Sequence, residues 1–305
     1  MSLKDLNKTQ KAAVEAIEGS VLIFAGAGSG KTRVLTHKMH YLIEGGHYKP
    51  EEILAVTFTN KAASEMKSRV ASMLGQKDLN INIGTFHSIC ARLLRSEISI
   101  LGYSRHFAIY DVQDQLDLMK IVLAELNVPK DMLSPNMVRN QISQYKSKMI
   151  TPKAQARKAR NKFDKLVADV YKAYQDKLKE NDALDFDDLL LKPLELFDKN
   201  PHILTKYQNM WKYILVDEYQ DTNRPQYEFL TLLSEQHGQI TVVGDDDQSI
   251  YGWRGADVTN ILNFEKFFPS CRVFTLEKNY RSTQQILEAA ISVVEIGRAS
   301  CRERV

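Results

Sequence analysis

The stretch FAGAGSGKT, residues Phe24–Thr32, decides the fold class of this chain. It follows an apolar run, Val21–Ala25, that is typical of a buried strand, and it opens a segment over Lys31–Leu42 whose apolar spacing predicts a helix. Alternating glycines let the backbone bend and turn its N–H groups toward phosphate oxygens. In this setting the stretch predicts a phosphate-binding loop for ATP, in which Lys31 reaches the β- and γ-phosphates and Thr32 offers a hydroxyl to Mg²⁺.

One position departs from the usual form of this loop. Ala25 stands where the common pattern has its first glycine, which is tolerable if the backbone there needs no positive φ. The N-terminus of the following helix adds partial positive charge, which favours an anion. The residues expected to hold the nucleotide in this loop are Ala25, Gly26, Ala27, Gly28, Ser29, Gly30, Lys31 and Thr32.

Short apolar runs alternate with amphipathic segments on both sides of a long helical stretch. This rhythm indicates an α/β fold with a parallel sheet and crossover helices. Between residues 102 and 185 apolar residues recur at helical spacing, which predicts an all-helical insertion, and residues 146–179 are rich in Lys and Arg with interleaved aromatics. The further strands we expect are Ile53–Phe58, Ile81–Gly84, Tyr213–Val216, Ile240–Val243 and Val273–Leu276.

The composition is that of an ordinary soluble globular protein. Of 305 residues 44% are hydrophobic and 26% charged, and the net charge of +3 is only weak evidence for a nucleic-acid partner. The three cysteines, Cys90, Cys271 and Cys301, are widely separated, which argues against a disulfide framework or zinc site and for a reducing compartment. The sequence has no signal peptide and no membrane span, so we expect a cytoplasmic protein without membrane contact.

A pair of acidic residues follows the run Tyr213–Val216. The carboxyl end of a parallel strand faces the ligand crevice, so Asp217 and Glu218 are expected beside the phosphate loop. Asp217 is a candidate ligand of Mg²⁺, together with Thr32. Glu218 is the candidate group to position and deprotonate the attacking water.

The next strand leads into a polar segment that contains two large aromatic residues. Gln248 offers a neutral amide that can touch both the γ-phosphate and a neighbouring loop. Tyr251 and Trp253 follow closely, either as core residues or as platforms on which bases stack. Their place beside the nucleotide-sensing strand favours stacking.

Together these residues resemble the Rep/UvrD/PcrA family of superfamily 1A DNA helicases. The resemblance runs motif by motif, in order, over about residues 3–290. It covers the Q motif Leu6–Gln10, motif I Ala25–Arg33, motif Ia Ala55–Ala63, motif Ib Gly84–Ser88, the segment Leu184–Leu189, motif II Val216–Thr222, motif III Val243–Gly255 and motif IV Leu276–Thr283.

The resemblance assigns further nucleotide contacts. It implies that Gln10 reads the adenine, that Tyr280 stacks on it, and that Arg33 belongs to the loop. Arg281 would reach the γ-phosphate and stabilise charge in the transition state. The implied catalytic set is Lys31, Asp217, Glu218, Gln248 and Arg281.

The resemblance also implies a path for DNA. Bases would stack on four aromatic side chains, and other residues would lie along the strand. The stacking residues are Phe58, Phe186, Tyr251 and Trp253, and the remainder are Asn60, Thr85, His87 and Arg254.

By the same resemblance, the complete protein from which this chain comes would be a DNA-dependent ATPase and helicase that moves 3′ to 5′ along single-stranded DNA with ATP and Mg²⁺. Its partners would be single-stranded DNA, junctions of single- and double-stranded DNA, and repair or replication proteins. ATP would lie between two RecA-like domains. The expected division is a first RecA-like domain over 1–103 and 186–268, a helical insert over 104–185, the start of a second RecA-like domain over 269–295, and a non-native tail over 296–305.

The family's chains are longer than this one and carry two later motifs. We therefore expect a fragment that binds nucleotide, binds DNA weakly and unwinds little, with residues after about Phe268 poorly held. Helix 283–294 would have an apolar face with little to cover it.

Three other interpretations compete with this one. The chain could be the motor part of a helicase–nuclease subunit, although the run Asp245–Tyr251 favours the stand-alone type. It could be a degenerate motor that binds DNA or a partner without turnover, which the intact Lys31 and Glu218 disfavour for the parent. It could be a P-loop switch that never touches DNA, which Phe58 and Trp253 disfavour.

Overall fold

The computed structural model describes residues 3–76, 79–129 and 132–302. At its centre is a six-stranded sheet in which every neighbouring pair of strands is parallel, in the order β3-β2-β6-β7-β1-β8. The strands are β1 Val21–Ala25, β2 Ile53–Thr57, β3 Asn82–Thr85, β6 Tyr213–Val216, β7 Ile240–Gly244 and β8 Arg272–Leu276. The predicted α/β sheet is therefore confirmed, with strand ends shifted by one residue at most.

Helices cover both faces of this sheet, which explains why its strands read as continuous apolar runs. In β1, Val21 and Ile23 pack into one hydrophobic cluster and Leu22 into the other. The first face carries α1 Lys8–Glu15, α2 Lys31–Glu44 and α3 Asn60–Leu74. The opposite face carries α4 Phe86–Glu97, α9 Phe186–Lys199, α10 Pro201–Met210, α11 Arg224–Ser234, α12 Thr259–Leu262 and α13 Phe264–Phe267.

Several single turns of 3-10 helix connect these elements. They matter for function where they follow the sheet's carboxyl ends, because they hold the motifs in place. They are η1 Leu3–Asp5, η2 Pro50–Glu52, η3 Ile98–Leu101, η4 Tyr219–Asp221, η5 Asp246–Gln248 and η6 Gly252–Arg254.

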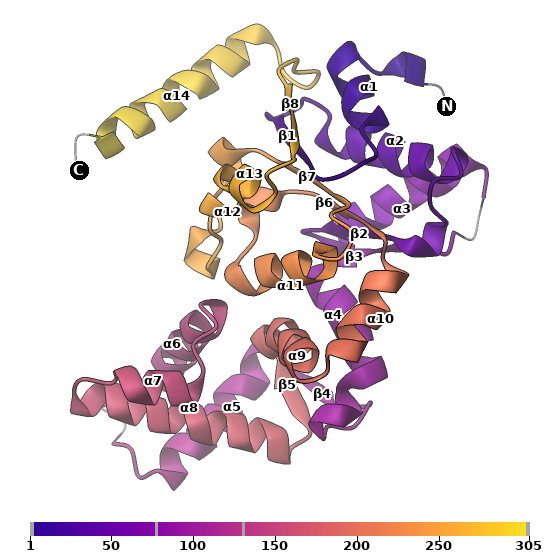
Figure 1. Ribbon diagram of the computed structural model, residues 1–305. Coiled ribbons are helices and arrows are strands. Elements are labelled where there is room, and N and C mark those ends of the chain that lie inside the picture. Colours follow the sequence, from indigo (N-terminus) through magenta and orange to yellow (C-terminus); the bar gives the residue numbers. More distant parts are fainter. Residues whose placement is uncertain (1–2, 77–78, 130–131, 303–305) are drawn as a thin grey trace.

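The insert leaves the sheet domain after α4 and packs as a separate helical layer with its own core (Figure 1). Tyr171 and Tyr174 are buried in that core. The sequence predicted helices alone here, but two strands of three residues each pair in parallel at the base of the insert. They are too short to show a periodicity. The elements are β4 Ala108–Tyr110, α5 Val112–Glu125, α6 Pro135–Ser147, α7 Pro152–Lys158, α8 Lys162–Glu180 and β5 Ala183–Asp185.

Strand β8 belongs to the same sheet as the phosphate loop. It pairs with β1 along its whole length, from Arg272 opposite Val21 to Leu276 opposite Ala25, and Leu276 is buried. The sequence placed a boundary at residue 269 and assigned this strand to a second RecA-like domain. That placement is wrong for β8, because β8 pairs with the otherwise free edge of β1 and is the sixth strand of this sheet. The rest of the predicted domain division stays a prediction.

Helix α14, Gln284–Arg302, extends away from the body after β8 (Figure 1). As the sequence indicated, apolar side chains on it are exposed, among them Ile286, Ile291, Val293 and Ile296. Part of the predicted non-native tail continues this helix, and residues 303–305 lie outside the described residues. Among the described residues, none of the helices combines the length and the apolar content needed to cross a lipid bilayer.

The pairing of β8 leads to a test by hydrogen exchange. Amides of β8 are expected to exchange with solvent as slowly as amides of β1. Amides of α14 are expected to exchange on the order of 100-fold faster, because the apolar face of this helix is uncovered. Helix α8 is the control, since it also has 19 residues but contributes side chains to the core of the insert. If β8 exchanged as fast as α14, its place in the sheet would be refuted.

Candidate nucleotide and DNA site

The phosphate loop connects β1 to α2. Gly28 and Gly30 adopt left-handed conformations, with φ of 70° and 93°, and Ser29 Oγ donates to the carbonyl of Gly26 at 2.7 Å. Ala25 does not need a positive φ, because it is still in the strand, opposite Leu276. An alanine is therefore compatible with this position. The loop leaves the first N–H groups of α2 without a side-chain cap, as an anion site requires.

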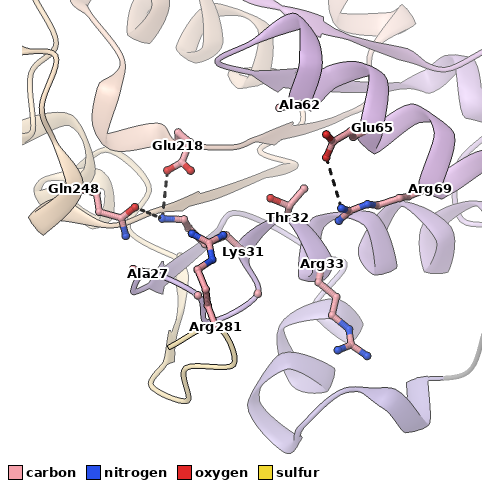
Figure 2. Close-up of a pocket in the computed structure, with 12 residues that line it drawn as sticks. Ala27, Lys31, Thr32, Arg33, Ala62, Glu65, Arg69, Glu218, Gln248 and Arg281 are labelled. Carbon is pink, nitrogen blue, oxygen red and sulfur yellow. Dashed lines mark hydrogen bonds and ion pairs between the residues drawn. The ribbon is translucent and has the colours of Figure 1, made fainter. Parts of the chain in front are cut away.

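Lys31 is buried and links three strand ends. Its Nζ lies 3.2 Å from Gln248 Oε1 and 3.3 Å from Glu218 Oε2 (Figure 2). Lys31 follows β1, Glu218 follows β6 and Gln248 follows β7, and these strands are neighbours in the sheet. The structure thus brings together three of the five predicted catalytic residues around one ammonium group.

Thr32 and Asp217 lie beside this cluster. Thr32 Oγ1 donates to Asp217 Oδ2 at 3.3 Å. Burial, and next the charge of Glu218, raise the pKa of Asp217 to about 6. A buried carboxylate whose charge is incompletely balanced, next to a hydroxyl, is a donor set that suits Mg²⁺. These two side chains therefore fit the predicted metal role.

No role was predicted for Gln220, yet its side chain connects motif II to motif III. Its side chain is buried, donates to Glu218 Oε2 at 2.9 Å and accepts from the backbone N–H of Asp245 at 3.0 Å. Glu218 has a φ of 51°, a left-handed conformation that costs an ordinary residue about 1 kcal/mol and persists where neighbours hold it. The hydrogen bond from Gln220 to Glu218 stabilises this conformation. In the sequence its amide gave no signal beyond lying next to the acidic pair.

The Q motif and motif IV close the loop from the other side. Gln10 Nε2 donates to the carbonyl of Ser29 at 2.9 Å, and Asn7 Nδ2 donates to Tyr280 Oη at 2.9 Å. The backbone N–H of Tyr280 donates to the carbonyl of Gly28 at 2.9 Å. Gln10 and Tyr280, the two residues expected at the adenine, therefore both contact the phosphate loop.

Asn279 is another residue that the sequence reasoning missed. Its side-chain amide donates to the carbonyl of Ala27, and its Oδ1 accepts from the N–H groups of Arg281 at 2.7 Å and Ser282 at 2.8 Å. A Cβ on Gly28 would lie 2.6 Å from the Cβ of Arg281, so motif IV packs directly on the loop. Only a residue without a side chain fits there.

A cavity of about 320 Å³ lies over the loop (Figure 2). Arg281 is one of the residues that line it, and its proposed contact with the γ-phosphate stays a prediction. Arg33 also lines it, but its guanidinium donates to the carbonyl of Asp5 at 2.9 Å. The sequence analysis did not predict that α3 forms one side of the cavity, through Ala62, Glu65 and Arg69. The lining residues are Ala27, Gly28, Gly30, Lys31, Thr32, Arg33, Ala62, Glu65, Arg69, Glu218, Gln248 and Arg281.

Three of the residues expected to stack on bases form one aromatic group. The ring centroids of Phe58 and Tyr251 are 4.6 Å apart, and those of Tyr251 and Trp253 are 6.5 Å apart. Trp253 is 73% exposed, which is unusual for tryptophan and is not what a core residue shows. Trp253 therefore lies at the surface and not in the core.

The fourth predicted stacking residue forms a second group. Phe186 is 49% exposed, and its ring makes a T-shaped contact with the ring of His87, with centroids 5.8 Å apart. Burial lowers the pKa of His87, so this imidazole is neutral at pH 7.

The remaining residues of the predicted DNA path differ in exposure and in hydrogen bonding. Thr85 caps α4, accepting from the N–H of Ser88 at 3.2 Å, so its hydroxyl has a structural partner. Asn60 is exposed at the start of α3. The side chain of Arg254 lies outside the described part of the structure.

The sheet, the phosphate loop and the acidic strand end define a P-loop nucleoside triphosphatase core of the RecA-like type. The chain matches the sequence model of the UvrD/REP helicase N-terminal domain over residues 6–269, and it belongs to that family. It is 50% identical over 293 residues to the ATP-dependent DNA helicase PcrA of Bacillus subtilis strain 168. It is 47% identical to the proteins of the same name from Staphylococcus epidermidis and Staphylococcus aureus.

The matched region is 96% of this chain but 40% of each of these relatives. The chain therefore spans about two fifths of the length of the curated relatives it matches.

The packing around Gln220 gives a test with a matched control. A Cβ on Gly244 would lie 2.6 Å from both Gln220 Oε1 and the Cδ1 of Ile261, so Gly244→Ala is expected to cost about 1–3 kcal/mol of unfolding free energy. Gly252→Ala meets nothing within 4 Å and should change it by less than about 0.5 kcal/mol. Urea denaturation of both variants measures the difference. Equal stabilities would show that the Gln220 bridge is not tightly packed.

Proposed function

We propose that this chain is the ATP-binding motor portion of a DNA helicase, a DNA-dependent ATPase that moves 3′ to 5′ along single-stranded DNA. One observation carries this proposal. The segment after β7 holds Gln248 against Lys31 in the nucleotide site and, five residues later, presents the exposed ring of Trp253. A single short segment therefore touches both the expected phosphate position and a surface suited to bases.

The nucleotide chemistry follows from the cluster around Lys31. The loop N–H groups and Lys31 would neutralise phosphate charge, and Thr32 and Asp217 would hold Mg²⁺, which would supply further positive charge. Glu218 orients and deprotonates water. When phosphate replaces Gln248 as the partner of Lys31, the side chain of Gln248 loses its 3.2 Å contact and keeps its hydrogen bond to Asp245, so its position depends on the nucleotide state.

Binding of DNA by stacking agrees with the sequence tolerance that a helicase needs, because every base has a π-face. Phe58, Tyr251 and Trp253 form one platform, and Phe186 a second. The names of the relatives support ATP dependence and a DNA substrate. The 3′-to-5′ direction rests on the family resemblance, and so do the proposed junction substrates, the repair or replication partners and the cytoplasmic location.

For the chain as given, we propose nucleotide binding and weak binding of DNA, with little unwinding. In the family the ATP lies between two RecA-like domains, whereas the sheet described here forms one. Arg281 lines the cavity, but its backbone N–H donates to Asn279, whose side chain donates to Ala27 of the loop in the same sheet domain.

The DNA part of the proposal is tested by one aromatic substitution. Trp253→Ala is expected to weaken binding of a fluorescent single-stranded oligonucleotide by about 1–3 kcal/mol, the value of one stacked base. Phe163→Ala is the control, because Phe163 is also an exposed aromatic but lies on α8 of the insert. Anisotropy titration at fixed salt measures both. Unchanged affinity in Trp253→Ala, or equal losses in both variants, would contradict the proposed stacking role.

A further inference from the structure

The last turn of α6 joins the insert to the sheet domain through a buried ammonium group. Lys146 Nζ lies 2.7 Å from Asp185 Oδ2 and 2.9 Å from Asp188 Oδ1, and all three side chains are buried. Lys146 belongs to the insert, and Asp185 ends β5 where the chain returns to the sheet domain. The contact therefore spans the boundary between the two parts.

The polar groups in this contact have further partners. Tyr174 Oη donates to Asp185 Oδ2 at 3.1 Å, and Gln175 Nε2 donates to Asp188 Oδ1 at 3.3 Å. Asp185 Oδ1 accepts from the N–H of Asp188 at 2.9 Å, which caps the start of α9. A buried ion pair of this kind adds little net stability over apolar packing, yet removing one member leaves an uncompensated charge. Its use lies in fixing a geometry.

Phe186 is the residue whose geometry it fixes. Phe186 follows Asp185 and is the first residue of α9, so its backbone lies between the two carboxylates that Lys146 holds. Its ring is half exposed and faces His87. The clamp therefore sets the position of one predicted base-stacking ring.

The neighbouring residue of α6, Ser147, contacts the segment that carries Trp253. A Cβ on Gly255 would lie 2.9 Å from the Cβ of Ser147, so α6 packs closely against the segment that carries Trp253. Gly255 ends the 3-10 turn Gly252–Arg254 in a left-handed conformation with φ of 84°. Two consecutive residues of one helix thus contact the segments that carry Phe186 and Trp253.

We propose that Lys146 is a positioning residue for DNA binding, which fixes Phe186 relative to Trp253 so that both rings stack on bases of the same strand. This inference rests on the proposed function. A purely structural role would instead stabilise the insert without a specific link to Phe186. The two roles differ in whether substitutions of Lys146 and Phe186 act on DNA binding together or independently.

The test compares single-stranded oligonucleotide affinities of the full chain by anisotropy. Lys146→Met keeps the length of the side chain but removes its charge, and is expected to weaken binding about ten-fold, as Phe186→Ala does by removing one stacked base. Lys172→Met is the control, because Lys172 pairs with Asp176 on the exposed surface of the same insert. It should change the affinity less than about two-fold.

The deciding measurement is the double variant. If Lys146 acts through Phe186, adding Lys146→Met to Phe186→Ala weakens binding less than about two-fold further. Multiplying losses, near 100-fold in total, would overturn the proposal and leave a structural role. If wild type binds no DNA at all, the proposed function fails first and this inference with it.

A milder variant guards against unfolding. If circular dichroism shows that Lys146→Met does not fold, Asp188→Asn replaces it in the same cycle, since Lys146 then keeps its 2.7 Å partner Asp185. The expected loss is smaller, about three-fold, and again absent in the Phe186→Ala background. An equal loss in both backgrounds would overturn the proposal.

Discussion

The ammonium group of Lys31 is the constraint on which the rest of the site depends. A buried cation needs anionic or carbonyl-type partners, and Lys31 has Glu218 and Gln248 at 3.3 and 3.2 Å. Those partners come from the ends of β6 and β7, so each of these strands must lie directly next to β1 or be separated from it by one strand. The observed strand order β6-β7-β1 meets this requirement. Parallel pairing of all three strands then brings their carboxyl ends to one edge.

The same edge couples nucleotide to the expected DNA surface through very short connections. Gln248 and Trp253 are separated by one loop, and Gln220 ties Glu218 to the N–H of Asp245 at the start of that loop. A change at the phosphates that releases Lys31 acts on Glu218 and Gln248, which remain tied to Gln220 and Asp245. The helical insert borders this loop as well, because Ser147 packs against Gly255.

Much of this arrangement could be predicted from the sequence because it is local. The loop glycines, the acidic pair after Val216 and the apolar runs each carry their own signal, and the strands were placed within one residue. The family resemblance added residues, such as Gln10 and Arg281, whose roles no local pattern shows. Both do lie at the phosphate loop, although their proposed contacts with nucleotide stay predictions.

The features that were missed depend on contacts between distant segments. Whether β8 joins β1 or a second sheet depends on a free strand edge, which an apolar run does not reveal. Strands β4 and β5 pair across some seventy residues but have three residues each. Gln220 and Asn279 are ordinary polar residues in sequence and acquire a role only where two loops meet. The same holds for Lys146, which in sequence is one of many basic residues in the segment 146–179.

The most direct measurement is calorimetric titration of the chain with Mg-ATP, beside Lys31→Ala and the exposed control Lys11→Ala. Loss of a charge-assisted hydrogen bond, worth about 1.5–3 kcal/mol, predicts at least ten-fold weaker binding for Lys31→Ala and unchanged binding for Lys11→Ala. Equal affinities in all three proteins would contradict the central claim that the buried ammonium group of Lys31 organises the site for phosphate.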